Sequence, residues 1–569
     1  MILTHMPANL AIRLQENADQ FPKKPVFILP GRKSGWETVT YRQFNERSRL
    51  LARGLAALGI QPGMRAALMA PPSVDFFALL FALLRAGVVP VMVDPAIGLR
   101  NVTTCLAAAQ PEVYFGSALT HAIRLLFGWG KHSLRLSLRI SDVLRAGEER
   151  VRRTSLRGTV PTESPSHLTE FSPKVGCDAL PPETEAAIIY TSGSTGLPKG
   201  VVFSQTNFSA QIEMLVRVLD LRGNEVDLPA FPLFAMIDCL LGVTAVIPDL
   251  RFPSPARVDP ARMADAIKTH HVDTMFVSPA ALDRLAQYGV KNRVKLPRLK
   301  KVITAGAPAP VAVQEMFHRL LSPEAGLFGV YGSTETLPVS IINSREVLGE
   351  TRYLSERGAG VCIGRPVEGA QVRIISIRDE AIPVWSTALE LPVGAVGEIT
   401  VKGVAVTEAY AGQAQATLLA KIRDVDGQTV HRMGDLGYFD EKGRLWYCGR
   451  KSHRVMTADG TLFTEPLEGI FNAHPQVYRS ALVGVEKAGI VEPMLWVELS
   501  PAARDADQNQ IRAELLGLAQ AHKMAHSIKT ILFHAAFPTD VRHNSKIIRE
   551  KLAGKALTTK YTKGREGKP

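Results

Sequence analysis

Apolar stretches and amphipathic stretches alternate regularly through the first half of the chain. Residues 65–72 (RAALMAPP) have the pattern of a strand and turn, and residues 73–87 have that of a buried helix. A second strand follows at 88–95 (VVPVMVDP). Because this order is typical of parallel strands joined by a helix, we predict a parallel sheet covered by helices. The alternation returns at 186–194 and 273–289.

The pattern changes after residue 360. Short extended pieces such as AQVRIISI, GEITVKG and GRLWYCG lie among glycines as far as residue 449, which predicts a small β-rich subdomain. The remaining sequence is long enough for a compact α+β domain. We therefore predict an α/β protein whose N-terminal domain (1–449) holds helix-covered sheets and the β-rich subdomain (about 360–449). A small, mobile C-terminal lid domain with a basic tail is expected at 450–569.

The composition is that of a globular protein of more than one domain: 569 residues, 46% hydrophobic and 21% charged. A net charge of +13 indicates an anionic partner, such as a nucleotide, an anionic lipid or nucleic acid. No zinc-finger spacing, RNA-binding aromatic pattern or long basic block is present, so we do not expect nucleic-acid binding.

Cellular location is indicated by the cysteines and the apolar runs. Five widely spaced cysteines without a CxxC pair favour a reducing compartment. The N-terminus becomes polar too soon for a signal peptide. The longest apolar run, at 76–84, is too short to span a bilayer. We therefore expect a soluble, cytoplasmic protein.

The segment 121–147 interleaves basic residues with leucine, isoleucine, phenylalanine and Trp129. Taken as one helix, it has an imperfect apolar stripe. Two interpretations remain open. One is an ordinary helix with a basic exposed side, and the other is a surface that faces a membrane or a protein partner.

Residues 190–200 read YTSGSTGLPKG and have the composition of a phosphate-binding loop. They do not form a Walker A motif, because Gly196 is not followed by Lys and Ser or Thr at the required spacing. Small residues nevertheless let backbone N–H groups approach oxyanions, while hydroxyls add donors and a lysine adds a cation. The residues predicted to hold phosphate are Thr191, Ser192, Gly193, Ser194, Thr195, Gly196 and Lys199.

This loop resembles that of the adenylate-forming superfamily, which includes acyl-CoA synthetases, luciferases, peptide-synthetase adenylation domains and fatty-acyl-AMP ligases. Further motifs follow in the family's order, and the likeness runs from about residue 10 to about residue 552. TAGAPAP (304–310) resembles the loop that lies along the adenine. The small residues that this likeness assigns to the base are Gly306, Ala307 and Pro308.

VYGSTET (330–336) resembles the next motif of the superfamily. The resemblance implies that Tyr331 stacks on the adenine, that Thr334 touches phosphate and that Glu335 holds Mg²⁺. A carboxylate suits this hard cation, which prefers oxygen ligands. The resemblance places Gly332 and Ser333 at the nucleotide as well.

The C-terminal motifs supply the ribose contacts and a lysine. In HRMGDLGYFDEKGRLWYCGRK (431–451), the resemblance assigns Asp435 and Arg450 to the ribose hydroxyls. In RHNSKIIREKL (542–552), Lys546 matches the lysine that binds the acyl carboxylate and α-phosphate during adenylation. An ammonium there stabilises negative charge in the transition state. Ser545 stands where the family usually has glycine.

The resemblance implies a first half-reaction that uses ATP and Mg²⁺. A carboxylate attacks the α-phosphate, pyrophosphate leaves and an acyl-adenylate forms. The catalytic residues that follow from the resemblance are Lys199, Glu335 and Lys546.

Departures from the family pattern bear on the second half-reaction. Ala235 stands where many members have an aromatic or histidine gate, and Ser452 followed by His453 stands where CoA-using synthetases carry a hinge Asp or Lys. Met456 replaces a usual lysine. With the strings FPLFAMID and VYGSTETLPVS, these departures look closest to the β-lactone synthetases of olefin biosynthesis.

Enzymes of that branch activate a long-chain β-hydroxy acid, and the β-hydroxyl then displaces AMP to close a β-lactone. The alternatives are a long-chain acyl-CoA ligase and a fatty-acyl-AMP ligase. Asp238 is either a polar contact for the β-hydroxyl or a hydrogen-bonded structural residue. The resemblance also implies contact with other olefin-biosynthesis enzymes, for which 121–147 is the candidate surface, and peripheral membrane contact is a further possibility.

Overall fold

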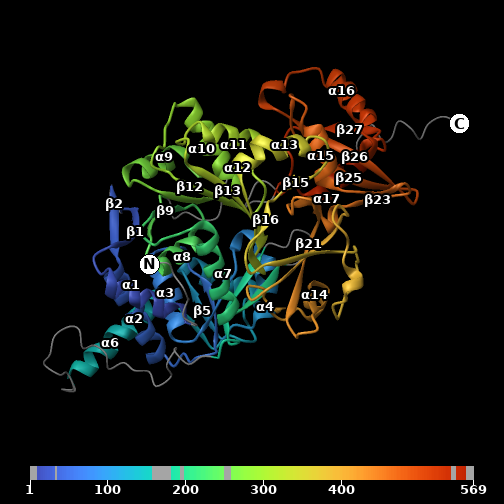
Figure 1. The fold of residues 1–569 in the computed structure, drawn as a ribbon. Coiled ribbons are helices and arrows are strands. Elements are labelled where there is room, and N and C mark those ends of the chain that lie inside the picture. Colours follow the sequence, from blue (N-terminus) through green and yellow to red (C-terminus); the bar gives the residue numbers. More distant parts are fainter. Residues whose placement is uncertain are drawn as a thin grey trace.

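The computed structural model (Figure 1) describes most of the chain. The described residues are 9–31, 35–156, 181–191, 198–248, 258–539 and 546–558. Two large sheets with helices on their faces form the α/β body, and smaller sheets follow towards the C-terminus. This arrangement confirms the predicted α/β class.

The first large sheet has nine strands in the order β16-β14-β13-β12-β11-β9-β10-β1-β2 among the described residues. The strands are β1 (Pro25–Pro30), β2 (Trp36–Thr40), β9 (Val226–Pro229), β10 (Thr244–Val246), β11 (Thr274–Val277), β12 (Lys301–Ala305), β13 (Gly326–Ser333), β14 (Thr336–Asn343) and β16 (Arg365–Pro366). From β1 through β13 the neighbours run parallel, and both edges are antiparallel. One face packs against α9 (Pro260–Thr269), α10 (Pro279–Lys291) and α11 (Val311–His318).

The second large sheet has seven strands in the order β19-β8-β7-β4-β3-β5-β6 over the described ranges. The strands are β3 (Arg65–Met69), β4 (Val89–Met92), β5 (Val113–Gly116), β6 (Leu136–Leu138), β7 (Glu185–Thr191), β8 (Lys199–Ser204) and β19 (Ala409–Tyr410). Strands β3 and β4 are parallel neighbours, as the strand–helix–strand pattern predicts. Buried residues on successive positions of β3 and β4 reflect cover on both faces.

Helices fill the space between the two sheets. The largest core cluster joins both sheets to α1 (Leu10–Gln20), α2 (Tyr41–Ala57), α3 (Val74–Arg85), α7 (Gln205–Leu219) and α8 (Pro232–Leu241). Helix α3 is apolar all round, as a helix buried on every side must be. It begins where the Ser73 side chain accepts a hydrogen bond from the Phe76 amide at 3.1 Å. Outside the second sheet lies α4 (Leu99–Ala109).

The β-rich part forms a separate six-stranded sheet. Its strands are β15 (Val361–Cys362), β17 (Gln371–Ile375), β18 (Gly397–Lys402), β20 (Lys421–Arg423), β21 (Thr429–Phe439) and β22 (Leu445–Arg450). Between β18 and β20 the chain crosses to the second large sheet, where β19 pairs with β8, and returns through α14 (Ala414–Ala420). This crossing fastens the β-rich part to the α/β body.

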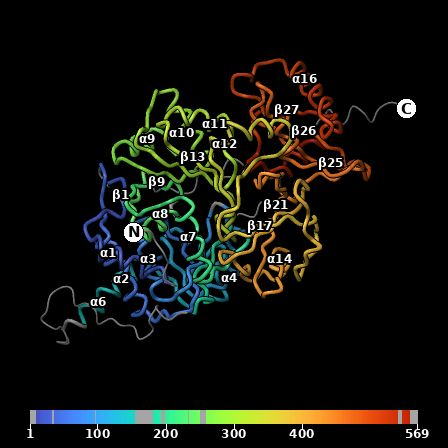
Figure 2. Tube along the Cα trace, viewed as in Figure 1, coloured from blue at the N-terminus to red at the C-terminus, as the bar shows by residue number. Residues whose placement is uncertain are grey.

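The C-terminal part has its own sheet and core. Its elements are β23 (Val455–Thr457), β24 (Gly460–Leu462), α15 (Thr464–Asn472), β25 (Val477–Lys487), β26 (Ile490–Leu499), α16 (Gln508–Ala521), β27 (Thr530–Phe533) and α17 (Arg549–Thr558). In Figures 1 and 2 this part lies beside α13 (Arg352–Ser355) and β15. The chain passes from one sheet to another near residues 360 and 449. The domain boundaries predicted at these positions stay predictions.

The interpretation of residues 121–147 as one helix is wrong. Helix α5 (Ala118–Phe127) ends at Gly128, whose φ of +65° is left-handed, and β6 and α6 (Ile140–Leu156) follow. Trp129 is buried in the turn, and its indole N–H donates to Thr103 Oγ1 at 3.0 Å. Two glycines with positive φ within three residues break the helix that the leucine spacing predicts. None of the helices in the described part of the chain has the length and apolar character needed to cross a membrane.

The connection to the C-terminal part runs through the short 3₁₀ helix Lys451–His453. Nζ of Lys451 lies 3.2 Å from Oε1 of the buried Glu398, whose Oε2 accepts from Arg432 at 2.7 Å. Burial lowers the pKa of His453 to about 4, and the charges of Arg549 and Arg450 act in the same direction. His453 is therefore neutral in the folded protein at neutral pH.

This neutral histidine predicts a pH dependence of stability. The unfolded chain protonates His453 below about pH 6.5, whereas the folded chain resists protonation down to about 4. The associated stability is complete above pH 6.5 and is lost as the pH falls towards 4, by about 2 kcal/mol at pH 5. We expect His453→Gln to show a smaller drop in melting temperature than the parent between pH 7.5 and 5. His132→Gln, at an exposed ring, is the control, and equal drops in all three proteins would contradict the assignment.

Candidate active site

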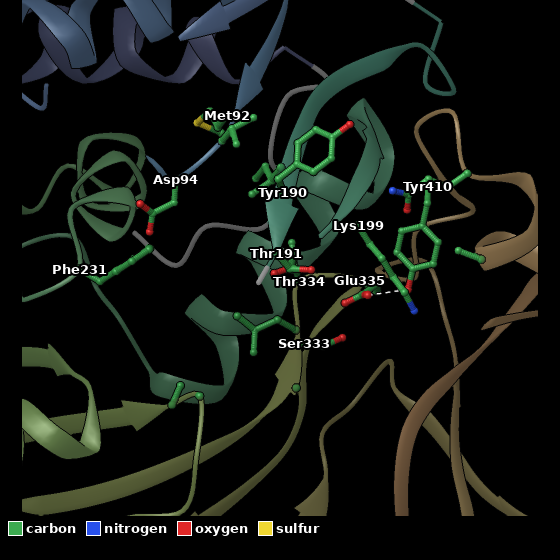
Figure 3. Close-up of a pocket in the computed structure, with 18 of the residues that line it drawn as sticks. Met92, Asp94, Tyr190, Thr191, Lys199, Phe231, Ser333, Thr334, Glu335 and Tyr410 are labelled. Atoms are coloured by element: carbon green, nitrogen blue, oxygen red, sulfur yellow. Dashed lines mark hydrogen bonds between the residues drawn. The ribbon is translucent and has the colours of Figure 1, made fainter. Parts of the chain in front are cut away.

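A cavity of about 1600 Å³ lies where the two large sheets, the six-stranded sheet and the C-terminal part meet. Figure 3 shows some of the residues that line it. The predicted site residues on its wall are Thr191, Lys199, Gly306, Gly332, Ser333, Thr334, Glu335, Arg450 and Lys546. Segments more than 350 residues apart in sequence therefore converge on one space.

The centre of the predicted phosphate loop lies outside the described residues. This concerns Ser192, Gly193, Ser194, Thr195 and Gly196. The two ends of the loop are held together, because Thr191 on β7 and Lys199 on β8 are partners in an antiparallel pair. Next to them, a side chain on Gly200 would meet the ring of Tyr190 at 2.6 Å, which accounts for glycine there.

Glu335 is a buried carboxylate at the tip of the β13–β14 hairpin. The Tyr410 hydroxyl donates to its Oε1 at 2.6 Å (Figure 3). Burial alone would raise the pKa of this carboxyl, yet the pKa is lowered to about 2. The lowering comes from His431, from the Tyr410 hydroxyl and from Lys421. Glu335 is therefore ionised at every physiological pH, as a ligand for a hard cation must be.

Tyr410 is the centre of a charged cluster that the sequence motifs did not reveal. Nζ of Lys199 lies 5.1 Å from the centroid of its ring, and Nζ of Lys421 lies 5.8 Å from it. Burial lowers the pKa of Lys421 to about 7, against the opposing effect of Glu335. Lys421 donates to the Thr407 carbonyl oxygen. Two cations and one carboxylate thus share a single tyrosine at the cavity wall.

The two predicted ribose residues, Asp435 and Arg450, form a compact group with Tyr331, which was predicted to stack on the adenine. The Tyr331 hydroxyl donates to Oδ2 of Asp435 at 2.7 Å, and Nη1 of Arg450 lies 3.0 Å from Oδ1. Although Oδ1 of Asp435 is buried, it accepts no hydrogen bond from any described residue. The Ser333 hydroxyl, on the wall of the cavity, is likewise buried without a described partner. Because buried polar atoms are normally paired, the Ser333 hydroxyl is open to a ligand in the cavity, whereas Oδ1 of Asp435 is ion-paired with Arg450.

The remaining predicted nucleotide residues are placed unequally. Gly306 lines the cavity, and its φ of +93° requires the conformational freedom of glycine. Ala307 and Pro308 follow in the same turn, where Pro308 is exposed and neither residue is among those that line the cavity.

Lys546 reaches the cavity from the C-terminal part. Burial raises the pKa of the nearby Asp435, and the charges of Arg450 and Lys546 oppose this rise. The short helix that follows it is anchored by Arg549, which donates to the buried Glu468. These bonds attach the start of α17 to α15. The lysine is therefore carried by a segment with its own firm contact inside the C-terminal part.

The opposite side of the cavity is mostly apolar, with Asp94 among its polar residues (Figure 3). Figure 3 shows Met92 and Phe231 across the space from Lys199, Glu335 and Tyr410. Other apolar residues that line the cavity are Leu68, Met69, Ala70, Pro71, Phe76, Phe77, Val93, Leu119, Phe234 and Phe276. A volume of about 1600 Å³ exceeds what a single small ligand usually needs, about 300–1,000 Å³.

At this part of the wall Phe234, and not its neighbour Ala235, faces the cavity. Its ring stacks on Phe276 with centroids 3.5 Å apart, whereas Ala235 is fully buried in the core. Asp238 does not line the main cavity. It borders a small space of about 30 Å³ that Phe234 and Phe276 also line, together with a second buried acid, Asp227. Burial and the neighbouring Asp227 raise the pKa of Asp238. This position favours a structural role for Asp238.

Three residues of the wall were missed by the sequence motifs: Tyr410, His431 and Gln413. Gln413 donates through Nε2 to the Pro198 carbonyl at 2.9 Å, and its Oε1 is buried without a partner among the described residues. Burial, with the nearby charge of Lys421, lowers the pKa of His431 to about 3. No short motif joins these residues, which lie on three different elements.

Comparison with known proteins agrees with this geometry. The chain is 43% identical over 560 residues to a protein of Stenotrophomonas maltophilia named olefin beta-lactone synthetase, covering 96% of this chain and 98% of that protein. It is 42% identical over 555 residues to a protein of the same name from Xanthomonas campestris, covering 96% and 97%.

Solved structures show the same fold at low identity. The amide bond synthetase McbA from Marinactinospora thermotolerans has a TM-score of 0.73 at 21% identity, covering 97% of this chain and all (100%) of that one. An O-succinylbenzoate coenzyme A synthetase from Bacillus subtilis, in complex with AMP, has a TM-score of 0.71 at 18% identity, covering 95% and 97%. The model of the family described as AMP-binding enzyme matches residues 14–411, well over half of the chain. The chain therefore belongs to the AMP-binding enzyme family.

Proposed function

We propose that this enzyme activates a long-chain β-hydroxy acid with ATP and closes it to a β-lactone, releasing AMP and pyrophosphate. The observation that carries the proposal is a single cavity with a charged end, at Lys199 and Glu335, and an apolar wall opposite. The charged end suits the phosphates of a nucleotide, and the apolar wall suits an alkyl chain. The likeness to two proteins named olefin beta-lactone synthetase supports the choice of acid and product.

In the first step, a carboxylate oxygen of the acid attacks the α-phosphorus of ATP, and the bond to pyrophosphate breaks. Lys546 is suited to hold the carboxylate and the α-phosphate, whose negative charge increases in the transition state. Lys199 is suited to the departing pyrophosphate. Asp435 and Arg450, which form an ion pair beside the cavity, are suited to bind the ribose hydroxyls.

Glu335 would hold Mg²⁺ together with the phosphate oxygens, and Thr334 beside it would contact phosphate. The fit rests on the low pKa of the Glu335 carboxyl, about 2, which keeps it a full anion. Mg²⁺ usually takes only one or two protein carboxylates and completes its shell with phosphate and water. When bound, the ion neutralises charge on the phosphates.

In the second step, the β-hydroxyl oxygen of the same molecule attacks the activated carbonyl carbon. The carbon–oxygen bond to AMP breaks, the hydroxyl proton is lost and a four-membered ring closes. Because the nucleophile is tethered, no second substrate has to enter. Well-oriented intramolecular reactions gain effective molarities of about 10⁵–10⁸ M, and ring strain offsets part of this gain.

The compartment and the protein partners are part of the proposal. The four cysteines in the described part of the chain are buried and free, which supports action in the reducing cytoplasm. Other olefin-biosynthesis enzymes remain proposed partners.

The first prediction concerns the second nucleophile. With ATP, Mg²⁺ and a long-chain β-hydroxy acid but no CoA, we expect steady AMP release and a β-lactone, identified by mass spectrometry. The matched acid without the hydroxyl should give at most one turnover, because its adenylate has no nucleophile. A CoA-dependent thioester without lactone would show an acyl-CoA ligase, and a stable adenylate that accumulates from both acids would show an acyl-AMP ligase.

The second prediction concerns Lys546. Removing its ammonium in Lys546→Ala should slow adenylate formation, measured as pyrophosphate release, by at least about 100-fold, as loss of a transition-state donor does. Lys551→Ala, at an exposed position of α17, is the matched control and should retain the parent rate. Unchanged circular dichroism would exclude misfolding. Near-parental pyrophosphate release by Lys546→Ala would refute the assignment.

The third prediction concerns Tyr410, a positioning residue for Glu335. Tyr410→Phe removes the 2.6 Å hydrogen bond to Oε1 and keeps the ring beside Lys199. Loss of such a supporting bond typically costs about 10- to 100-fold in activity or metal affinity. We expect the Mg²⁺ concentration for half-maximal pyrophosphate release to rise by that factor.

The control for Tyr410 is Tyr438→Phe, which deletes a 2.9 Å bond to the Ala359 carbonyl outside the cavity. Its Mg²⁺ requirement should match that of the parent. If both variants, or neither, show a raised requirement, the hydroxyl of Tyr410 does not position Glu335.

A further inference from the structure

Helix α5 turns an apolar face to solvent. Ala118, Leu119, Ala122, Leu125 and Leu126 are spaced as neighbours on one side of a helix, and all five are exposed. The exposed fractions of the three leucines are 69%, 71% and 81%, in chain order. A surface helix normally buries its apolar stripe against the core. In α5 the apolar stripe faces solvent instead.

Contacts on the opposite side fix this orientation. Ile123 and Phe127 pack against the core cluster that contains Trp129. The His121 ring bonds the Leu138 carbonyl at 3.2 Å, and the Arg124 guanidinium lies 5.6 Å from the centroid of the Tyr114 ring. The first turn is closed by a capping box between Ser117 and Thr120. The helix is thus anchored on one side, and its leucines stay outside.

The sequence of this helix and of the residues that follow it is basic. Residues 118–139 contain four arginines and lysines and no acidic residue, within a chain of net charge +13. Lys131, Arg135 and Arg139 are exposed, and Arg135 also pairs with Glu112 at 3.2 Å. Exposed leucines beside arginine and lysine are the composition of helices that lie in the interface of an anionic membrane. A protein partner would need an acidic, apolar groove to match the same surface.

The face continues into the active-site cavity. Leu119 belongs to the exposed stripe and also lines the cavity, as do Ser117 and Thr120 from the start of the same helix. Phe76 and Met92 carry the apolar lining further inside. An apolar path therefore leads from the outer surface of α5 to the wall opposite the charged cluster.

We propose that the exposed face of α5 rests on an anionic lipid bilayer and that the acid enters the cavity from the membrane past Leu119. The route of entry rests on the proposed function, because it assumes a water-insoluble, long-chain acid. The docking of the helix does not. The leucines insert among acyl chains while the basic residues meet lipid headgroups, so binding combines buried apolar area with electrostatic attraction.

The test uses the full chain and sedimentation with sucrose-loaded vesicles, without substrate. The parent should bind vesicles of 70% phosphatidylcholine and 30% phosphatidylglycerol and bind phosphatidylcholine alone weakly. Leu125→Glu/Leu126→Glu should reduce partitioning into the anionic vesicles at least about tenfold, because two charges replace two inserting leucines. These positions do not line the cavity. The matched control is Val393→Glu/Val425→Glu, at residues 61% and 87% exposed outside α5, which should bind as the parent does.

The readouts separate docking from catalysis. AMP release with a short, water-soluble β-hydroxy acid should be the same for parent and α5 variant, so loss of it in both would count against the function and not the surface. Equal vesicle binding by parent and α5 variant would overturn the docking proposal. A parent that ignores vesicles but self-associates in sedimentation velocity through these leucines would also overturn it, in favour of an interface between two copies.

Discussion

A buried carboxylate, Glu335, imposes the constraint on which the rest of the site depends. A negative charge taken out of water is costly unless donors and cations surround it. Here the Tyr410 hydroxyl, which donates to Glu335, and the nearby Lys421 supply that surrounding, and the pKa of the Glu335 carboxyl is lowered to about 2 despite full burial. Lys421 belongs to the β-rich part, Tyr410 to the second large sheet through β19, and Glu335 to the β13–β14 hairpin of the nine-stranded sheet. The charge therefore requires these three parts to be packed together.

The same packing explains how one cavity serves two unlike ligands. The crossing of β19 to the second sheet brings Tyr410 to Lys199, which makes the charged end, and the helices between the sheets bring aromatic rings to the other end. An acyl-adenylate is a reactive mixed anhydride that water would destroy. The apolar wall of the same cavity keeps water from that end, which suits an intermediate of this kind.

Much of this was predictable from local patterns. The strand–helix–strand unit at 65–95 follows from hydrophobic runs, and the motifs at 190–200 and 330–336 identify one wall of the cavity. The cluster around Tyr410 was not predictable, since its members are joined by sheet pairing and not by spacing. The prediction of one helix over residues 121–147 failed because Gly128 and Gly130 break an otherwise helical pattern. Phe234 replaces Ala235 at the wall because helix orientation, and not motif alignment, decides which residue faces the cavity.

The central claim is that the carboxylate is activated and the hydroxyl then closes the ring. It is tested most directly by labelling both carboxylate oxygens of the β-hydroxy acid with ¹⁸O and analysing the products by mass spectrometry. The account predicts AMP with one ¹⁸O, transferred when the acyl carbon–oxygen bond breaks, and a lactone that keeps one ¹⁸O in its carbonyl and has an unlabelled ring oxygen. Unlabelled AMP together with a lactone that retains both labels would mean that the hydroxyl is the activated group, and would contradict the account.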